Sequence, residues 1–382
     1  MLKDLLLKNK LIWNINKNIK AYQVESKYKK NFNYYRKMDF NNDIDDLLRS
    51  RGWSDVNKNA LKVFYFGGDP LQDFGGFNQA LANMYDLKLF YKRDGSYGQY
   101  SRGQARDQNL DWLSEQFDSY KREENWVPDI LMMQSFGFNI NIEKMKKLKE
   151  MYGFKIINIG MDERLSYKLG IENGYEKGIA GLNEIVDLVL VTTPECVEWY
   201  LKEGIPAFYF PLASNEEVYF PIENIEKKYD VGFIGRNYGL RKELIQFLTK
   251  NGINIKAYGP GWGSGVLDVN DNNEFYNSCK IVLGTANIAY SSKLMNPKLR
   301  DFEVPLSGTL YITNYTQELT ELYQGDKEIV FYKTKDELLK KINLYLGNDK
   351  MRDEIAKNGY EKALAAHTYQ VRLKEIFNKF LK

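Results

Sequence analysis

The stretch from Asn296 to Glu303 carries the densest group of side chains that could bind an anion. Its sequence is Asn-Pro-Lys-Leu-Arg-Asp-Phe-Glu, and Pro297 suits the first turn of a helix. A helix beginning there would hold Lys298 in its first turn with Arg300 nearby, so a diphosphate would meet two cations and the helix-end amides. Glu303 would then lie near the carboxyl end, where a carboxylate is unfavourable, which suggests a role such as holding ribose hydroxyls. An ordinary solvated charged face is the alternative.

Two glycine loops follow expected strands, where backbone N–H groups can hold phosphates. The first is Gly67-Gly-Asp-Pro70, with two more glycines at 75–76, and the second is Gly235-Arg-Asn-Tyr-Gly239. Glycine is also an ordinary turn residue, so one such loop alone is weak support. The glycines of 259–263 have GxGxG spacing interrupted by Pro260, which argues against nicotinamide binding, and there is no GxxxxGK[ST] phosphate loop.

Histidine and cysteine are too scarce for several kinds of site. His367 is the one histidine, and we interpret it as structural; two well-separated cysteines exclude a thiolate zinc site. Asp43-Ile-Asp45 matches the DxD pattern of metal-dependent transferases, but capping of a helix by Asn42 or Asp43 is the simpler interpretation. We therefore expect no metal, and chemistry that uses carboxylates, Lys, Arg, Tyr and backbone amides.

Length and composition indicate a folded protein of two or three domains. The chain has 382 residues, of which 43% are hydrophobic and 27% charged, with a net charge of +3. That charge is too small to indicate a nucleic-acid partner. No apolar window is long enough to span a bilayer, and lysines interrupt the apolar residues of the N-terminus, so we expect a cytoplasmic protein.

Strands and helices alternate in two sets, which predicts βαβ units and mostly parallel sheets. The first set begins at Leu61 and ends near Phe210, an acidic link follows, and the second set begins at Tyr229. We expect two facing α/β domains. The predicted boundaries are a basic helical extension at 1–60, an N-terminal domain at 61–215, a linker at 216–228, a C-terminal domain at 229–365 and a final helix at 366–382.

The first 40 residues are strongly basic, with ten Lys or Arg against three acids, a net charge of +7. Leu5, Ile12, Ile15 and Ile19 recur at helical spacing, which predicts an amphipathic helix whose apolar face packs on its own domain. The alternative is a surface that contacts anionic lipid or an acidic partner.

The C-terminal half resembles the spore-maturation-protein type of bacterial glycosyltransferases, near the group 1 transferases. The resemblance rests on 230–235, on the Lys-x-Arg-x-x-Glu spacing of 298–303, on Gly308 and on His367-Thr-Tyr369 with Arg372. The first half follows the same strand order more loosely. The resemblance implies a GT-B fold, meaning two Rossmann-like domains across a cleft, with the last helix crossing back to the first domain.

The same resemblance implies a transferase that takes a nucleoside-diphosphate sugar, with UDP-sugars favoured, and needs no metal. The acceptor would be a cell-surface glycan, a glycolipid or a protein. Glu303 would bind ribose. The implied diphosphate ligands are Gly235, Arg236, Arg241, Lys298 and Arg300, and the residues implied to border the nucleoside base are Tyr258, Gly259 and Trp262.

One departure from that family concerns the stereochemistry of transfer. Group 1 retaining enzymes usually carry an E-x7-E pair, and Met295 stands where the first glutamate would be. An inverting enzyme needs a general base near the acceptor hydroxyl. Our first candidate is Asp69 and our second is Asp162, although an Asp at a strand end often only fixes a turn.

Two other functions fit the same architecture. A nucleotide-sugar epimerase would convert the donor without an acceptor, and a two-lobed sugar-binding protein would neither convert it nor release nucleotide.

Overall fold

A computed structural model describes residues 10–40, 42–57, 60–101 and 105–381. The chain forms two compact units. The C-terminal unit comprises residues 1–30 and 212–368, and the N-terminal unit comprises 31–211 and 369–382. Both contain a parallel sheet with helices, which confirms the predicted α/β class with two Rossmann-like domains. The extension expected at 1–60 is shared between the units, and the individual domain boundaries stay predictions.

The N-terminal unit is built on a six-stranded sheet in the order β2-β1-β3-β4-β7-β8, and every strand pair in it is parallel. Most residues of the central strands are buried and apolar, as expected for a parallel sheet that helices cover on both faces. The strands are β1 (Lys62–Phe66), β2 (Asp86–Leu89), β3 (Ile130–Met133), β4 (Lys155–Gly160), β7 (Leu188–Val191) and β8 (Ala207–Tyr209). A small hairpin, β5 (Ile171–Glu172) with β6 (Tyr175–Glu176), lies outside this sheet.

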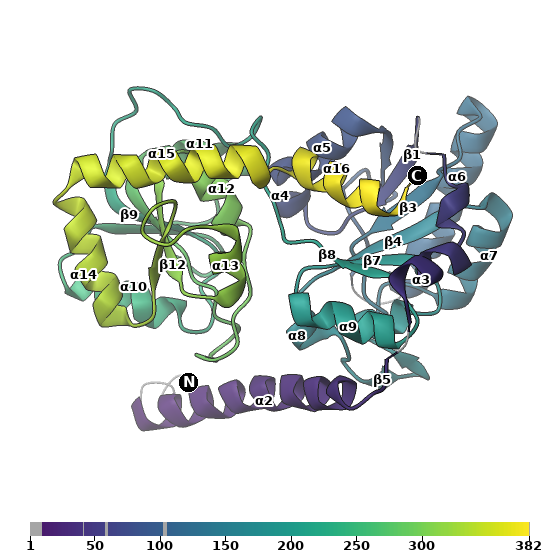
Figure 1. Cartoon of the computed structure of the whole chain (residues 1–382), viewed down its shortest axis with the longest axis horizontal. Helices are drawn as coiled ribbons and strands as arrows, with labels where there is room; N and C mark the ends of the chain where they lie inside the picture. Colours follow the sequence, from purple (N-terminus) through teal and green to yellow (C-terminus); the bar gives the residue numbers. More distant parts are fainter. Residues whose placement is uncertain (1–9, 41, 58–59, 102–104, 382) are drawn as a thin grey trace. The chain divides into compact units, whose positions relative to one another are not determined.

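The helices of this unit follow the predicted alternation with the strands (Figure 1). They are α3 (Ile44–Ser50), η1 (Trp53–Asp55), α4 (Pro70–Gln72), η2 (Asp73–Phe77), α5 (Asn78–Met84), α6 (Ala105–Glu124), α7 (Ile142–Tyr152), α8 (Glu163–Ser166), η3 (Ile179–Leu182), α9 (Pro194–Lys202) and α16 (Tyr369–Phe380). Asp43 caps α3, its side chain accepting from two backbone N–H groups, which is the simpler interpretation of the DxD pattern.

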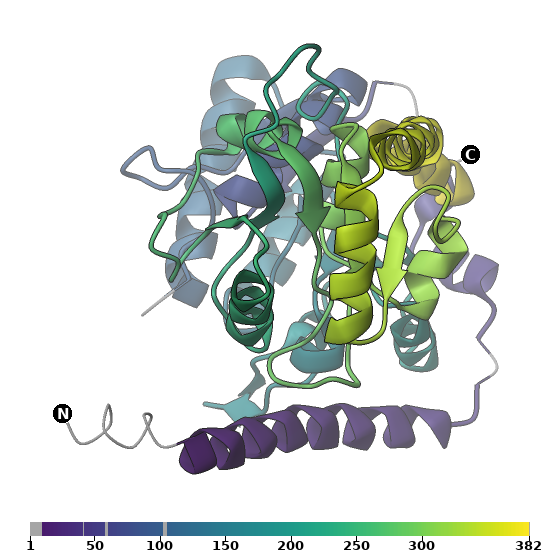
Figure 2. The same cartoon turned by 90° about the vertical axis from the view of Figure 1, so that its left-hand side faces the viewer.

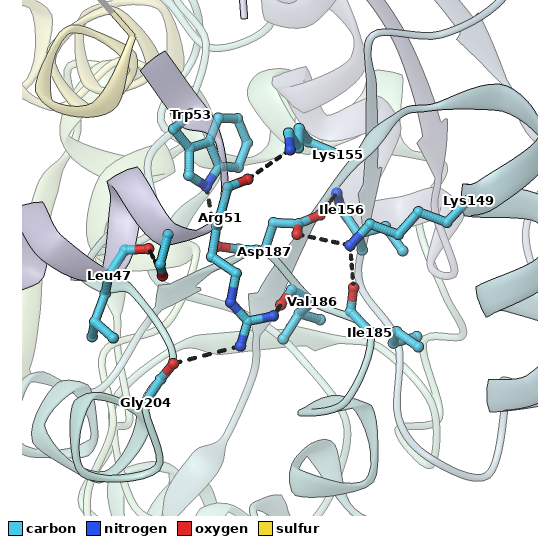
Figure 3. Close-up of polar contacts among 11 residues, drawn as sticks. Leu47, Arg51, Trp53, Lys149, Lys155, Ile156, Ile185, Val186, Asp187 and Gly204 are labelled. Atoms are coloured by element: carbon cyan, nitrogen blue, oxygen red, sulfur yellow. Dashed lines mark hydrogen bonds and ion pairs between the residues drawn. The ribbon is translucent and has the colours of Figure 1, made fainter. Parts of the chain in front are cut away.

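Residues 51–53 are anchored to the sheet of the N-terminal unit (Figure 3). The indole of the buried Trp53 donates to the carbonyl of Asp187 at 3.1 Å, and the guanidinium of Arg51 donates to Val186. The ammonium of Lys155 in turn donates to the carbonyl of Arg51. These residues of the expected extension are therefore part of the folded N-terminal unit.

The last helix, α16, packs on the N-terminal unit, as the predicted fold class requires. Tyr369 contacts Phe77 at 5.1 Å between ring centroids, and Phe377 stacks on Tyr85 at the same separation. The guanidinium of Arg372 donates to the carbonyl of Pro211 at 2.7 Å. The two ring contacts come from the apolar face of an amphipathic helix.

The C-terminal unit contains a five-stranded parallel sheet in the order β10-β9-β11-β12-β13. Its strands are β9 (Tyr229–Ile234), β10 (Ile255–Tyr258), β11 (Cys279–Leu283), β12 (Leu310–Asn314) and β13 (Val330–Tyr332). Its helices are α10 (Arg241–Lys250), η4 (Val269–Asp271), α11 (Asn272–Asn277), α12 (Arg300–Leu306), α13 (Gln317–Leu322), α14 (Lys335–Leu346) and α15 (Asp349–Ala366). Figures 1 and 2 show α10 and α14 on one face of the sheet and α15 on the other.

Helix α2 (Lys10–Arg36) differs from the predicted amphipathic helix. Within the C-terminal unit it is held by polar and aromatic contacts: Trp13 and Lys17 both bond to Glu243, and Trp13 packs edge-on against Tyr290. Ile15 and Ile19 are each about half exposed, at 50% and 49%, so the prediction that they pack on the domain was wrong for these two, whereas Ile12 is half-buried. The contacts of Trp13 and Lys17 take that place, and Leu5 lies outside the described residues.

Candidate functional site

The candidate donor site lies where the strands of the C-terminal sheet end. In a parallel sheet the carboxyl ends of neighbouring strands meet at one edge, and ligands bind in the loops beyond it. Arg300, the first residue of α12, donates to the carbonyl of Ile234 at 2.6 Å and of Thr285 at 3.4 Å. The first carbonyl belongs to the last residue of β9 and the second lies just after β11, so one side chain links the ends of two strands to the start of α12.

Two guanidinium groups lie among the loops that follow β9, β10 and β11 (residues 235–240, 259–268 and 284–299), which we call the loop cluster. Arg241, at the start of α10, donates to the Thr285 hydroxyl at 3.0 Å and to the Arg236 carbonyl at 3.0 Å. The guanidinium groups of Arg241 and Arg300 lie 5.7 Å and 5.0 Å from the centroid of the Phe233 ring. The aromatic ring and the loop carbonyls therefore hold two positive charges close together, while the Arg236 side chain is exposed at the surface.

Glycine is required at two of the predicted positions. Gly235 has φ +150°, and a Cβ there would come within 2.7 Å of Nη1 of Arg300 and 3.4 Å of Nη1 of Arg241. Gly259 has φ +127°, and a Cβ there would lie 2.4 Å from the carbonyl oxygen of Gly235. The two glycines thus let the loops after β9 and β10 approach each other and make room for both guanidinium groups.

The helix expected from Pro297 begins three residues later, so that prediction was wrong. Asp301 accepts the backbone N–H of Lys298 at 2.5 Å, and the first helical carbonyl is that of Leu299. The side chain of Asp301 thereby holds 298–299 as a turn that precedes α12. Glu303 lies in the first turn of α12, where a carboxylate is favoured, and not near its carboxyl end. Its ribose-binding role stays a prediction.

Two buried carboxyl groups support the start of α12. Glu303 accepts from the Tyr276 hydroxyl at 2.9 Å, and Asp301 accepts from the Tyr311 hydroxyl at 2.5 Å. Burial raises the pKa of both carboxyl groups, while their hydroxyl partners and the nearby Arg300 act in the opposite direction. The sequence analysis singled out Glu303 but assigned no role to Asp301, because a side chain that caps its own turn has no distinctive spacing.

The residues predicted to border the base have different neighbours. The indole N–H of Trp262 donates to the Gly235 carbonyl at 2.7 Å, and its ring packs edge-on against Phe233. Tyr258 contacts Phe275 at 5.0 Å between ring centroids. Trp262 therefore belongs to the loop cluster around the two arginines, whereas Tyr258 packs against α11.

The first candidate base, Asp69, is an exposed helix cap in the N-terminal unit. Its carboxylate accepts the N–H of Leu71 at 3.0 Å, at the start of α4. The second candidate, Asp162, is half-buried after β4 and has φ +55°, a left-handed conformation that is uncommon for aspartate. The bond to Leu71 shows that Asp69 fixes a turn, which is the structural role that the sequence left open.

A buried carboxylate that the sequence did not single out holds the Asp69 loop. Asp73 accepts from the hydroxyls of Tyr65 and Tyr97 at 2.8 Å and 2.9 Å, and from the N–H groups of Gly68 and Asp69 at 3.1 Å and 3.3 Å. Burial raises the pKa of Asp73 to about 6, partly offset by these four donors. Asp73 thus holds the backbone of the loop that contains Asp69.

Glu163 occupies a comparable position beside Asp162. It is completely buried and accepts from the hydroxyls of Thr192 and Thr193, at 3.1 Å and 3.0 Å, and from the N–H of Thr192. Burial raises the pKa of Glu163 to about 7. Glycine stands at 160 because a Cβ there would lie 2.3 Å from Oε1 of Glu163. Nothing in the local sequence distinguishes it from a surface glutamate.

The remaining predicted features have simple structural environments. His367 is buried in the C-terminal unit, where Nε2 lies 3.0 Å from the carbonyl of Leu322 and the ring packs against Tyr323. Within the described ranges no three His, Cys, Asp or Glu side chains gather as a metal-binding group. No helix in those ranges is long and apolar enough to cross a bilayer.

Comparison with known proteins identifies the C-terminal part and the fold. Residues 236–378 match the family described as Glycosyl transferase-like. No curated protein sequence matches the chain. Sucrose-phosphate synthase from Thermosynechococcus elongatus is similar in structure, with a TM-score of 0.60 and 12% identity over 84% of this chain and 98% of that one.

Two further structures have the same fold. The Anabaena protein HepE, in complex with UDP and glucose, has a TM-score of 0.54 and 10% identity over 84% of this chain and 99% of its own. An alpha-glucosyltransferase in complex with UDP and a 13-mer DNA has a TM-score of 0.54 and 12% identity over 85% of this chain and all of its own. The matched domain and the fold together support a glycosyltransferase of the GT-B class.

Proposed function

We propose that the chain transfers a sugar from a UDP-sugar to a glycan, lipid-linked or protein acceptor, without a metal ion. The observation that carries this proposal is the pairing of Arg241 and Arg300 in the loops beyond β9 and β11. Two guanidinium groups at fixed positions match the charge and the oxygen geometry of a diphosphate. We also propose that the enzyme is of the spore-maturation-protein type, on the residues of 298–303 and the motif at His367.

The donor would lie along the loop cluster. Lys298 and Arg236 would add charge beside the two buried or half-buried arginines, and the backbone at Gly235 would approach the diphosphate closely. The Nε of Arg300 supports this orientation, because it is buried and has no hydrogen-bond partner among the described residues. A phosphate oxygen would satisfy that donor.

The nucleoside would extend from the diphosphate toward α12. Glu303 would accept hydrogen bonds from ribose hydroxyls, and Tyr258, Gly259 and Trp262 would border the base. The buried position of Glu303 supports this role, because a carboxylate there discriminates strongly for a ligand that brings hydrogen-bond donors.

Catalysis would rest mainly on stabilising the leaving diphosphate with fixed positive charge. If transfer inverts the sugar, Asp69 would take the proton from the acceptor hydroxyl, with Asp162 as the second candidate. The four hydrogen bonds that hold Asp73 support Asp69, because a general base works best on a rigid backbone. UDP is the favoured nucleotide because the similar HepE and alpha-glucosyltransferase structures contain UDP.

Helix α2 suggests where a membrane-bound acceptor would be met. Ile15, Ile19 and Tyr22 are exposed by 50%, 49% and 71%, and the lysines at 20, 29 and 30 are exposed on the same helix. Apolar side chains beside cations suit the surface of an anionic bilayer. We propose a peripheral contact of this kind, which sedimentation with vesicles of neutral or anionic phospholipid would test.

The function is tested by incubating the protein with UDP-sugars and crude cell-surface glycans in the presence of EDTA. We expect UDP release that depends on the acceptor and is unaffected by the chelator. An epimerase would convert the donor with no acceptor present, and a sugar-binding protein would release no UDP. Either of those results would reject the proposed transfer.

A further inference from the structure

A groove beside β2 and α6 of the N-terminal unit is separate from the residues assigned above to donor binding and catalysis. It has a volume of about 620 Å³, within the usual range of small-ligand sites. Three aromatic side chains line it: Tyr91, Trp112 and Tyr120. We propose that this aromatic groove binds an uncharged stretch of the acceptor glycan. The proposal rests on the proposed function and names its acceptor class.

The aromatic rings are held in place before any ligand binds. The indole N–H of Trp112 donates to the carbonyl of Tyr91 at 2.6 Å, and the Gln116 amide donates to the same carbonyl at 3.2 Å. The ammonium of Lys88 lies 4.1 Å from the centroid of the Tyr120 ring. Flat apolar rings at fixed positions suit the C–H faces of sugar rings, and preorganisation lowers the entropy lost on binding.

The charged lining of the groove is balanced. The charged residues that line it are Lys92, Arg122, Glu115 and Asp118, two cations and two anions. A nucleotide or a polyanionic chain would require an excess of positive charge. An uncharged ligand rich in hydroxyl groups requires polar partners of both kinds, which this lining provides. The charge balance therefore favours a neutral glycan.

Arg93, which is not one of the lining residues, lies over the Trp112 ring and can be displaced at small cost. Its guanidinium lies 4.5 Å from the centroid of the Trp112 ring and pairs with Glu115. The side chains of that ion pair are 56% and 49% exposed. Exposed ion pairs contribute little to stability, so a sugar ring can take the place of the guanidinium on Trp112.

The groove is joined to the Asp69 loop through one tyrosine. The ring of Tyr91 contacts that of Tyr97 at 5.7 Å between centroids, and the Tyr97 hydroxyl donates to Asp73 at 2.9 Å. Asp73 also accepts the backbone N–H of Asp69. A glycan whose inner residues occupy the groove would therefore lie beside the loop that carries the candidate base.

The test is isothermal titration of the full chain with maltohexaose, cellohexaose and chitohexaose, without nucleotide. We expect at least one of these neutral chains to bind, and Trp112→Ala to weaken that binding at least tenfold. Tyr91→Ala removes an exposed ring whose hydrogen bonds come from its backbone, so it serves as the second variant if Trp112→Ala fails to fold. Phe40→Ala, another exposed aromatic of the same unit, is the matched control and should bind within twofold of wild type.

Failure of all three hexasaccharides to bind, or unchanged affinity in the folded groove variants, would overturn the proposal. UDP binding measured on the same samples tests the proposed donor site separately from the aromatic groove. UDP binding with no hexasaccharide binding would reject the groove alone, whereas hexasaccharide binding sensitive to Trp112→Ala would support the groove even if UDP did not bind.

Discussion

The guanidinium of Arg300 donates a 2.6 Å hydrogen bond to the carbonyl of Ile234, although 66 positions separate the two residues. This bond ties the start of α12 to the end of β9, across the middle of the C-terminal sheet. The same side chain reaches the carbonyl of Thr285 beyond β11. Arg300 therefore both builds the loop cluster and, together with Arg241, supplies positive charge to it.

Arg300→Lys should weaken UDP binding about tenfold or more, which corresponds to about 1.4 kcal/mol. A lysine ammonium cannot bond both carbonyls and still present a planar pair of donors to a phosphate. Isothermal titration with UDP measures the change. Arg352→Lys is the matched control, because Arg352 is also buried in this unit and bonds to Tyr345 and Asp349. Wild-type affinity in Arg300→Lys would contradict the assignment.

Gly235→Ala should abolish UDP binding and lower the free energy of unfolding. A Cβ would come within 2.7 Å of the Arg300 guanidinium at a backbone conformation that alanine rarely adopts. Gly252→Ala separates the effect of backbone strain from the effect of contact with Arg300, since Gly252 has φ +83° with open space around it. We expect about 1 kcal/mol of destabilisation and normal UDP binding there. Equal effects of the two substitutions on binding would mean that contact with Arg300 is unimportant.

Asp69→Asn should lower kcat at least a hundredfold while Tm stays within a degree or two. Asparagine caps a helix about as well as aspartate, so the hydrogen bond to Leu71 survives while the basic group is lost. Steady-state transfer rates and thermal melts provide the comparison, with Asp162→Asn measured beside it. Unchanged kcat in Asp69→Asn would mean that Asp69 is not the general base.

The free energy of unfolding should depend on pH through Glu163. Burial raises its pKa in the folded state to about 7, above the usual 4.5 of a glutamate, so the folded chain holds this proton more tightly. The resulting stabilisation is fully present below pH 4.5 and is lost as pH rises through 7, a change of about 3 kcal/mol at most. Asp73, with a pKa of about 6, adds a change of the same sign.

Urea unfolding at pH 5 and pH 8 measures this dependence. Glu163→Gln should lose less stability than wild type between the two pH values, because its amide does not ionise. Glu150→Gln, an exposed position on α7, is the control and should behave as wild type. Identical pH dependence in wild type and Glu163→Gln would show that Glu163 ionises as readily as an exposed glutamate.

The sequence predicted the sheets well because their signal is local. The second set of strands was expected to begin at Tyr229, where β9 begins, since buried parallel strands are continuous apolar runs. β2 has a weaker sequence signal, because this edge strand has an exposed Asp86 and only half-buried residues after it. The start of α12 was misplaced because it depends on one side-chain hydrogen bond, from Lys298 to Asp301.

The candidate site was only partly predictable from the sequence. Gly235, Arg241 and Arg300 were identified and do come together, because the glycine follows a strand and each arginine opens a helix. Asp73 and Glu163 were not identified, since burial of a carboxylate in a loop depends on tertiary partners distant in sequence. The partners of Asp73, for example, include Tyr97, and those of Glu163 include Thr192 and Thr193.

The most direct test of the central claim is a thermal-shift panel of UDP, GDP, ADP, dTDP and their common sugars, without added metal. A ligand that binds only the folded state raises Tm, and the rise grows with the logarithm of the ligand concentration above Kd. We predict that UDP and UDP-sugars raise the Tm of wild type, and that Glu303→Ala, still folded, shows a much smaller rise. No shift with any nucleotide at millimolar concentration would contradict a nucleotide-sugar site in the C-terminal unit.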